Sequence, residues 1–202
     1  MKKRFPASMT RRSIVDVRLE KPLLHLHGAI DIDSFWKAVR QVIEAALPTC
    51  FIGLTLQHAP IFPRIVRWTR RIPNGFFAAG PIEHYFTTHP GRKLVQASDI
   101  FPDEQQLKKS RFYRNYMAPV NGQYALGLFF WSAGRLLSVI LVLRSANQGA
   151  LSRTDLKLLR QLYAHFQTAL GRLRSLEREH NVRLTLQQFM RRVPLPTILL
   201  RW

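Results

Sequence analysis

The sequence contains a single cysteine, Cys50, among its 202 residues. A disulfide framework and a thiolate zinc cluster each need several cysteines, so both are excluded. No apolar run reaches the ~18 residues that a membrane-spanning helix requires, and the basic start of the chain lacks the apolar stretch of a signal peptide. We therefore expect a protein of the reducing cytoplasm that has no membrane partner.

Acidic residues are scarce, since 12 Asp and Glu stand against 31 Lys and Arg, for a formal net charge of +19. Such a surface attracts nucleic acid, anionic lipid or acidic proteins at low salt. The basic residues are spread over the start of the chain, residues 64–71, residues 108–114 and the last predicted helix, rather than along one dense stripe. This spread favours a generally basic surface, with a nucleic-acid-binding protein that acts through charge as the alternative.

Motifs that carry catalysis are missing. The sequence has no glycine-rich phosphate loop, no GxSxG, no HExxH and no CxxC. No pair of carboxylates has a spacing that suggests acid–base catalysis, and Asp99, Asp103 and Glu104 are better interpreted as helix caps. We therefore expect neither an enzyme nor a cofactor.

A metal site is the remaining chemical alternative, because His25 and His27 form an HxH pair. On a strand the two side chains would share a face and could both bind a metal ion, whereas on a helix they would diverge. No third ligand lies nearby in the sequence, so the expected metal content is none.

The most regular stretch is a helix predicted over residues 152–193. Ser152 and Asp155 match an N-terminal cap, and Pro194 cannot sit inside a helix. A helix of ~40 residues spans roughly 60 Å, which exceeds the width of a domain of this size, so the distal half should leave the core. Apolar residues recur at steps of three and four, the spacing of a packed or coiled helix, and form the predicted dimer and connector seam: Leu159, Leu162, Phe166, Ala169, Leu173 and Leu176.

The two halves of this helix are predicted to differ. Residues 156–173 carry a wide apolar stripe, which should close a sheet and also contribute to a dimer seam. Residues 176–193 carry a narrower, interrupted seam with a basic exterior, which suits a connector.

Two segments, residues 124–131 and 136–143, are apolar on nearly every residue and are joined by a hairpin-length connection that contains Gly134. Strands of this kind are covered on both faces, so the expected class is α+β, with a central antiparallel sheet between helices. Further strands are predicted at 50–58, 65–71 and 93–96, and further helices at 31–47, 81–88 and 104–116.

Residues 14–26 are ambiguous. Val15, Val17 and Leu19 alternate as in a strand. Pro22 and the leucines that follow it could instead open a helical turn.

Four strings of this chain resemble the amino-terminal sensory region of LuxR-type transcriptional regulators with a GAF-like domain: DIDSFWKAV, SDIFPDEQQLKKSRFYRNYMAP, ALGLFFWSAGRLLSVILVLRSA and LSRTDLKLLRQLYAHFQTALGRL. The resemblance covers about residues 20–200 and rests on hydrophobic and turn residues. It implies a GAF fold with helices on both faces of the sheet, a ligand-sized cavity, and dimerisation through the first and last helices. It implies no particular ligand, because no motif for a cyclic nucleotide or a bilin is matched.

The resemblance also divides the chain. Residues 1–13 form a basic tail, residues 14–175 the GAF-like domain, and residues 152–193 the long helix, whose first half belongs to the domain. Residues 194–202 resemble the start of a PAS-like segment. The helix-turn-helix of such regulators is not in the chain, so DNA would be contacted only through that missing domain.

The most promising ligand site is a set of aromatic residues in the loops and short helices over one face of the sheet. Amphipathic aromatics with arginine among them can line a pocket for a flat or anionic ligand, although ordinary core and rim is the alternative. The pocket is predicted at Arg67, Trp68, Phe76, Phe77, Tyr85, Phe112, Tyr113 and Tyr116. The resulting hypothesis is a non-enzymatic sensory and dimerisation module that binds a small ligand or partner and signals through its last helix.

Overall fold

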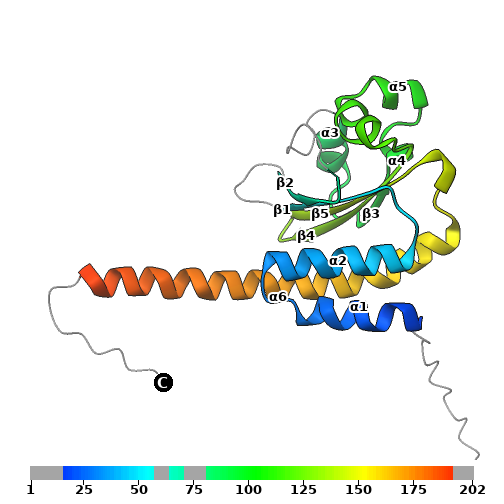
Figure 1. Cartoon of the computed structure of the whole chain (residues 1–202). Coiled ribbons are helices and arrows are strands. Elements are labelled where there is room, and N and C mark those ends of the chain that lie inside the picture. The colour runs from blue at the N-terminus through cyan, green and yellow to red at the C-terminus, as the bar shows by residue number, and fades with distance from the viewer. Residues whose placement is uncertain (1–15, 57–63, 71–80, 193–202) are drawn as a thin grey trace, which may run out of the picture.

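A computed structural model describes residues 16–56, 64–70 and 81–192. Its centre is a five-stranded antiparallel sheet in the order β2-β1-β5-β4-β3, and helices cover both faces (Figure 1). The predicted α+β class is therefore confirmed. The strands are β1 (Phe51–Leu56), β2 (Arg64–Trp68), β3 (Leu94–Gln96), β4 (Tyr124–Ser132) and β5 (Arg135–Arg144).

One face of the sheet is covered by two long helices, α2 (Ile32–Ala46) and α6 (Arg153–Arg192), and α1 (Val17–Gly28) packs on these two helices from the side away from the sheet (Figure 1). The other face is covered by short helices and turns (Figure 1). These are α3 (Pro81–Thr88), α4 (Ala97–Ile100), α5 (Glu104–Lys109), the π-helical turn η1 (Tyr113–Met117) and the 3-10 turn η2 (Ala118–Val120). A further 3-10 turn, η3 (Ala146–Gln148), joins β5 to α6.

The central strands are apolar on almost every residue because each face builds its own core. Ile52, Leu54 and Phe130 point into a largely aliphatic core with α1, α2 and α6. Phe51 and Phe129, on the alternate positions, point into a second core with the short helices. This second core is rich in aromatic rings, and the Phe86 ring lies 4.2 Å from that of Phe129, measured between centroids.

Two glycines let aromatic rings lie flat on the sheet. A Cβ atom at Gly53 would come within 2.9 Å of the Phe51 ring, a distance that forces the ring to move. The Phe129 ring covers Gly127 in the same way. The face of β1 and β4 under the short helices is therefore filled by the chain's own side chains.

Of the ambiguous residues 14–26, those from Val17 onward lie in the helix α1, so the strand alternative is wrong for them. Residues 14 and 15 lie outside the described ranges. Asp16 caps α1 by accepting a hydrogen bond from the Arg18 backbone N–H at 3.1 Å. Pro22 lies inside the helix, where it costs about 3 kcal/mol. Leu19, Leu23 and Leu26 are buried at helical spacing, and each contributes roughly 1.5–3 kcal/mol, which outweighs the proline.

The helix predicted at residues 104–116 is broken in the structure. The first part, α5, ends at Lys109, and Ser110 takes an extended backbone conformation. The Ser110 hydroxyl donates to the Leu107 carbonyl at 2.6 Å and accepts from the Tyr113 N–H at 3.1 Å. One side chain thus caps both turns, a local competition with the helix that apolar spacing does not reveal.

Side chains also cap the starts of α2 and α6, and the cap of α6 is the one that Ser152 and Asp155 predict. Asp31 accepts from the Ser34 N–H at 2.7 Å at the start of α2. At the start of α6, Asp155 N–H donates to the Ser152 hydroxyl at 3.1 Å, and Ser152 N–H donates to the Asp155 carboxylate at 2.9 Å. The β4–β5 hairpin turns through Gly134 at φ +74°, as expected, and also through Ala133 at φ +48°.

Within the described ranges, no helix is both long and apolar enough to cross a membrane. The predicted basic tail at 1–13 and the predicted PAS-like segment at 194–202 lie outside those ranges.

Candidate functional site

The structure does not bring the whole predicted pocket together. Phe76 and Phe77 lie outside the described residues. In the pairing of β1 with β2, Arg67 lies opposite Leu54 and Trp68 opposite Gly53. Because Leu54 belongs to the core with α2 and α6, Arg67 faces that side, where its Nη2 pairs with the Asp33 carboxylate at 2.7 Å. Trp68 faces the other side and is 38% exposed.

The remaining predicted aromatics are mostly core. Phe112 and Tyr116 are buried, with ring centroids 5.7 Å apart, and burial raises the pKa of the Tyr116 hydroxyl to about 12. Tyr85 is half-buried, and its ring stacks on His89 at 4.5 Å between centroids. These side chains fill the space over the sheet, as the alternative of ordinary core and rim requires, and only Tyr113 reaches a cavity.

That cavity lies between α4, α5, the η1–η2 turns and the start of β4, and its volume is about 610 Å³. It opens where α5 breaks at Ser110 and the chain turns back toward the sheet, with Asn121 in the left-handed region at φ +54°. Its lining mixes apolar, neutral polar and two charged residues: Gln96, Ala97, Ser98, Phe101, Pro102, Glu104, Leu107, Lys108, Tyr113, Ala118, Asn121, Gly122, Gln123, Tyr124, Ala125 and Leu151.

The cavity touches the start of the long helix through Leu151, which directly precedes the Ser152 cap. The buried Arg144 guanidinium holds this joint by donating to the carbonyls of Gln148 and Ala150 and to the Asp155 carboxylate, the last at 3.1 Å. The Nε of Arg144 has no hydrogen-bond partner among the described residues. A single side chain thus ties the end of β5 to the first turn of α6.

Of the residues that line the cavity, the sequence predicted Tyr113 alone as a pocket residue. The others were missed for a physical reason. The cavity exists because Ser110 interrupts a helix and because the chain reverses at Asn121 and Gly122. The Asn-Gly pair was the available signal, since this dipeptide favours positive φ and marks turns.

The predicted seam of the long helix is a core face of its own chain. Leu159, Leu162, Phe166, Ala169 and Leu173 are all buried against α1, α2 and the sheet, and Leu176 is half-buried. The expected closure of the domain by the first half of α6 is confirmed, but these buried side chains present no surface to a second chain.

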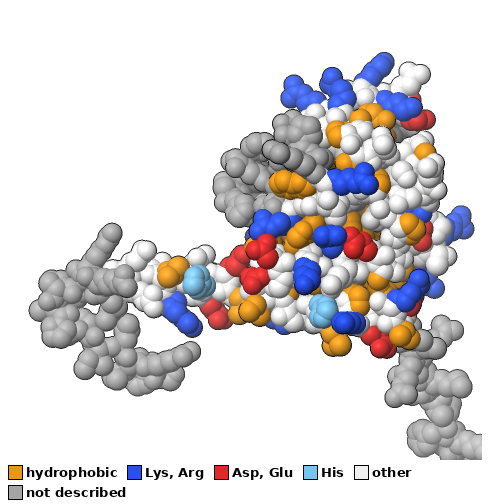
Figure 2. Space-filling model, in the orientation of Figure 1, with side chains coloured by type: hydrophobic (Ala, Val, Ile, Leu, Met, Phe, Trp, Pro, Cys, Tyr) orange, Lys and Arg blue, Asp and Glu red, His pale blue; other side chains and the backbone are white. Residues whose placement is uncertain are grey.

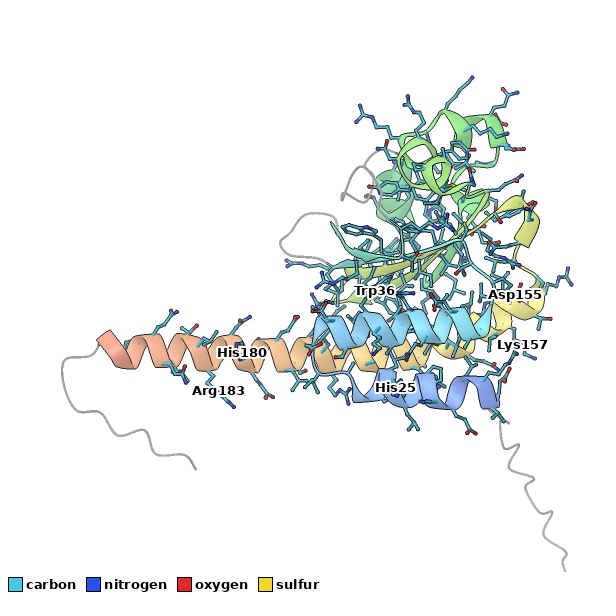
Figure 3. All side chains as sticks on the ribbon, viewed as in Figure 1. His25, Trp36, Asp155, Lys157, His180 and Arg183 are labelled. Atoms are coloured by element: carbon cyan, nitrogen blue, oxygen red, sulfur yellow. The ribbon has the colours of Figure 1, made fainter. Side chains whose placement is uncertain are left out.

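Beyond Leu173 the helix projects from the domain with no other described element beside it (Figure 1). His180 and Arg183 point outward from this projecting half (Figure 3). Every side chain from Glu177 to Phe189 is exposed. Large apolar residues are among them, with exposed fractions of 54% for Val182, 47% for Leu186 and 62% for Phe189.

The two histidines of the HxH pair, His25 and His27, have different neighbours and do not share one site. They lie on α1, where the His25 ring contacts the Gln41 side chain at 2.9 Å, and the His27 Nε2 contacts the His165 Nδ1 at 2.9 Å. Burial, together with the positive charges of His165 and Arg172, lowers the pKa of His27. No cluster of three His, Cys, Asp or Glu side chains occurs in the described part of the chain.

Comparison with known proteins places the fold. The chain is similar to the GAF domain of a two-component sensor histidine kinase from Bacillus halodurans, at 17% identity and a TM-score of 0.56, over 72% of this chain and 97% of that one. It is similar to the VqsR LBD domain from Pseudomonas aeruginosa, at 15% identity and a TM-score of 0.53, over 78% and 99%. It is also similar to the cyanobacteriochrome TePixJ GAF domain, at 13% identity and a TM-score of 0.51, over 74% and 94%.

No protein-family model matches the sequence, and a comparison with curated proteins found no match. At these identities the structural likeness shows the fold alone. The GAF-like fold that the sequence led us to expect is thereby confirmed, with solved sensory domains among its structural neighbours.

Proposed function

We propose that this chain is a non-enzymatic sensory and dimerisation module of a bacterial transcriptional regulator of the LuxR type. A small ligand or partner biases the packing of the GAF-like domain, and α6 carries the change toward an output domain. The fold supports this proposal through its solved neighbours. Allosteric output of this kind requires two packings of α6 that the ligand distinguishes.

The observation that carries the proposal is the division of α6. Its first half is part of the core, whereas its second half extends beyond the core, and every side chain from Glu177 to Phe189 is exposed. Most helical stability in proteins comes from packing of an apolar face, and the exposed apolar residues of this half pack on no other described element. A partner that covers them would stabilise it. A helix that is packed in a domain with one half and extends beyond it with the other can transmit a conformational change of that domain to the element it contacts.

The partner we propose is a second copy of the chain. Val182, Leu186 and Phe189 lie at steps of four and three, which places them on one side of the helix. Both signs of charge lie around them, with Glu177 and Glu179 among the arginines, so two copies can pair opposite charges. This moves the dimer seam from the first half of α6, where the sequence predicted it, to the second.

Light scattering on the full chain tests the dimer. The expected mass is twice the 23.5 kDa of one chain. The double variant V182D/F189D is expected to run as one copy and to lose helical content, because two charges would enter the seam. The matched double variant H180D/Q187D has the same spacing, lies at exposed residues on the opposite side of the helix, and should remain dimeric. A monomer of the unaltered chain at high concentration would contradict the proposal.

The regulator context has its own test, which is the reading frame downstream of Trp202. A helix-turn-helix encoded there is the expected result. A frame that encodes a kinase or a chemotaxis module would replace transcription by another output, with the sensory role unchanged.

Nucleic-acid binding through charge is a second candidate, favoured by one surface. Lys108, Lys109, Arg111 and Arg114 are all exposed, and Lys and Arg side chains gather at the α5 end of the domain (Figure 2). Titration of labelled duplex DNA at two salt concentrations tests it, since phosphate contacts weaken steeply with salt. Absence of binding at low salt would eliminate this candidate.

A further inference from the structure

We infer that the cavity between α4, α5 and β4 is a binding site for a small, neutral molecule with hydrogen-bonding groups. The inference rests on the sensory function proposed above and names the place and the chemistry of its ligand. The cavity volume of about 610 Å³ falls within the ~300–1,000 Å³ of small-molecule sites. The chain's own aromatic rings fill the core over the sheet. This cavity lies at the edge of that core, where the described residues leave space for a ligand.

The charged residues of the lining do not favour a charged ligand. Glu104 and Lys108 are the two charged side chains that line the cavity, and they pair with each other at 2.8 Å. An ionised ligand would therefore lose water without gaining an opposite charge, which is unfavourable. A neutral ligand loses far less on entering.

The lining also offers hydrogen bonds that the described part of the protein leaves unused. Tyr113, Tyr124, Asn121 and Gln123 line the cavity, and the hydroxyls and side-chain amides of these four residues make no hydrogen bond to another described residue. Amides both donate and accept, and so do hydroxyls. A ligand with a carbonyl beside an N–H or O–H matches this set.

Apolar side chains complete the site. Phe101 and Ala125 are buried and line it, so a ring or short aliphatic part of a ligand has a surface to cover. Apolar walls with a few convergent polar groups are typical of small-molecule sites.

The position of the cavity connects it to α6. Leu151 lines it, Ser152 follows as the cap of α6, and Arg144 fixes both sides of this joint. A molecule in the cavity contacts the residue that leads into the signalling helix.

The test uses benzamide, benzoate and benzylamine, which share one ring and differ in charge. We expect benzamide, in NMR titrations of the full chain, to shift the resonances of Asn121, Gln123 and Tyr124 at concentrations up to roughly 10 mM. We expect the two charged probes to bind at least about tenfold more weakly. Charged probes that bind as well as benzamide, or an absence of benzamide shifts, would overturn the site.

A matched pair of variants locates the binding. A118W places an indole at an exposed residue that lines the cavity, and Q106W places one at an exposed residue of α5 outside it. We expect A118W to abolish the benzamide shifts and Q106W to leave them unchanged. Shifts that survive in A118W would place the binding elsewhere and refute the inference.

Hydrogen exchange separates this inference from the proposed function. Bound benzamide should slow amide exchange in the first turn of α6, at Asp155 and Leu156, because it fixes Leu151. Benzamide binding without that change would keep the site and refute its sensory role. Failure of the dimer test would count against the proposed output and leave the benzamide result standing.

Discussion

The two halves of α6 belong to one continuous helix and are stabilised in different ways. Residues 153–173 form an amphipathic helix whose apolar face is buried in the core. Residues 174–192 have few apolar residues, and Val182, Leu184, Leu186 and Phe189 among them are exposed. Helical spacing of leucines therefore identifies a packing face, but it does not identify what that face packs against. In the first half the answer lies within the chain, and in the second half we propose that it is a second copy of the chain.

The largest expected effect comes from a charge placed in the first half. Phe166→Asp should lower the free energy of unfolding by more than about 4 kcal/mol, because Phe166 is fully buried and an unpaired carboxylate would replace it. Leu184→Asp, in the exposed second half, should change it by less than about 0.5 kcal/mol. Urea denaturation of both variants measures the difference. Equal destabilisation would show that the division of the helix is wrong.

The second-largest effect is expected when Arg144, which connects β5 to α6, is replaced. Arg144→Met should cost about 2–3 kcal/mol, since the Asp155 carboxylate and the carbonyls of Gln148 and Ala150 would lose their donor. Hydrogen exchange should rise in the first turn of α6 and stay unchanged beyond Leu173. Arg144→Lys should recover part of the stability, because a single ammonium cannot make the forked set of bonds. An unaltered first turn in Arg144→Met would contradict the role of this joint.

A smaller effect concerns pH and the contact of α1 with the first half of α6. The pKa of His27 lies below its ordinary value of 6.5 in the folded chain, mainly because of burial. Between that lowered pKa and 6.5 the unfolded chain binds more protons than the folded one, so the free energy of unfolding falls as pH falls through this window. Thermal unfolding at pH 7.5 and pH 5.5 should show the loss, and His27→Gln should reduce it. A pH dependence unchanged in His27→Gln would rule out this contribution.

The smallest expected effect lies at the border of the two halves. Gly171 is exposed, and a Cβ atom there meets no other atom within 4 Å. Gly171→Ala should raise the free energy of unfolding by about 0.5–1 kcal/mol, because alanine loses less backbone entropy in a helix. Gly149→Ala is the control, and it should destabilise the chain because Gly149 has φ +72°. No gain from Gly171→Ala in denaturation would indicate that the helix is already loosened at this border.

The extent of sequence prediction differs between the fold and the site. The two central strands, their hairpin, the capped start of α6 and the sheet between two helical layers were all predicted, because each depends on spacing or on a local hydrogen bond. The pocket was not predicted as the structure has it. Arg67 and Trp68 are adjacent in the sequence but face opposite sides of the sheet, and Phe112 and Tyr116 are core.

The sequence alone determines the local structure. Apolar spacing decides which residues must be buried, and Ser152, Asp155 and Asp31 decide where helices begin, because these effects act over a few residues. The partner of each apolar face is set by the tertiary structure. Leu159 to Leu173 turn inward because α1 and α2 lie beside them, and the cavity appears where Ser110 and Asn121 redirect the chain next to Leu151. Contacts between residues far apart in the sequence decide both, and no local pattern records them.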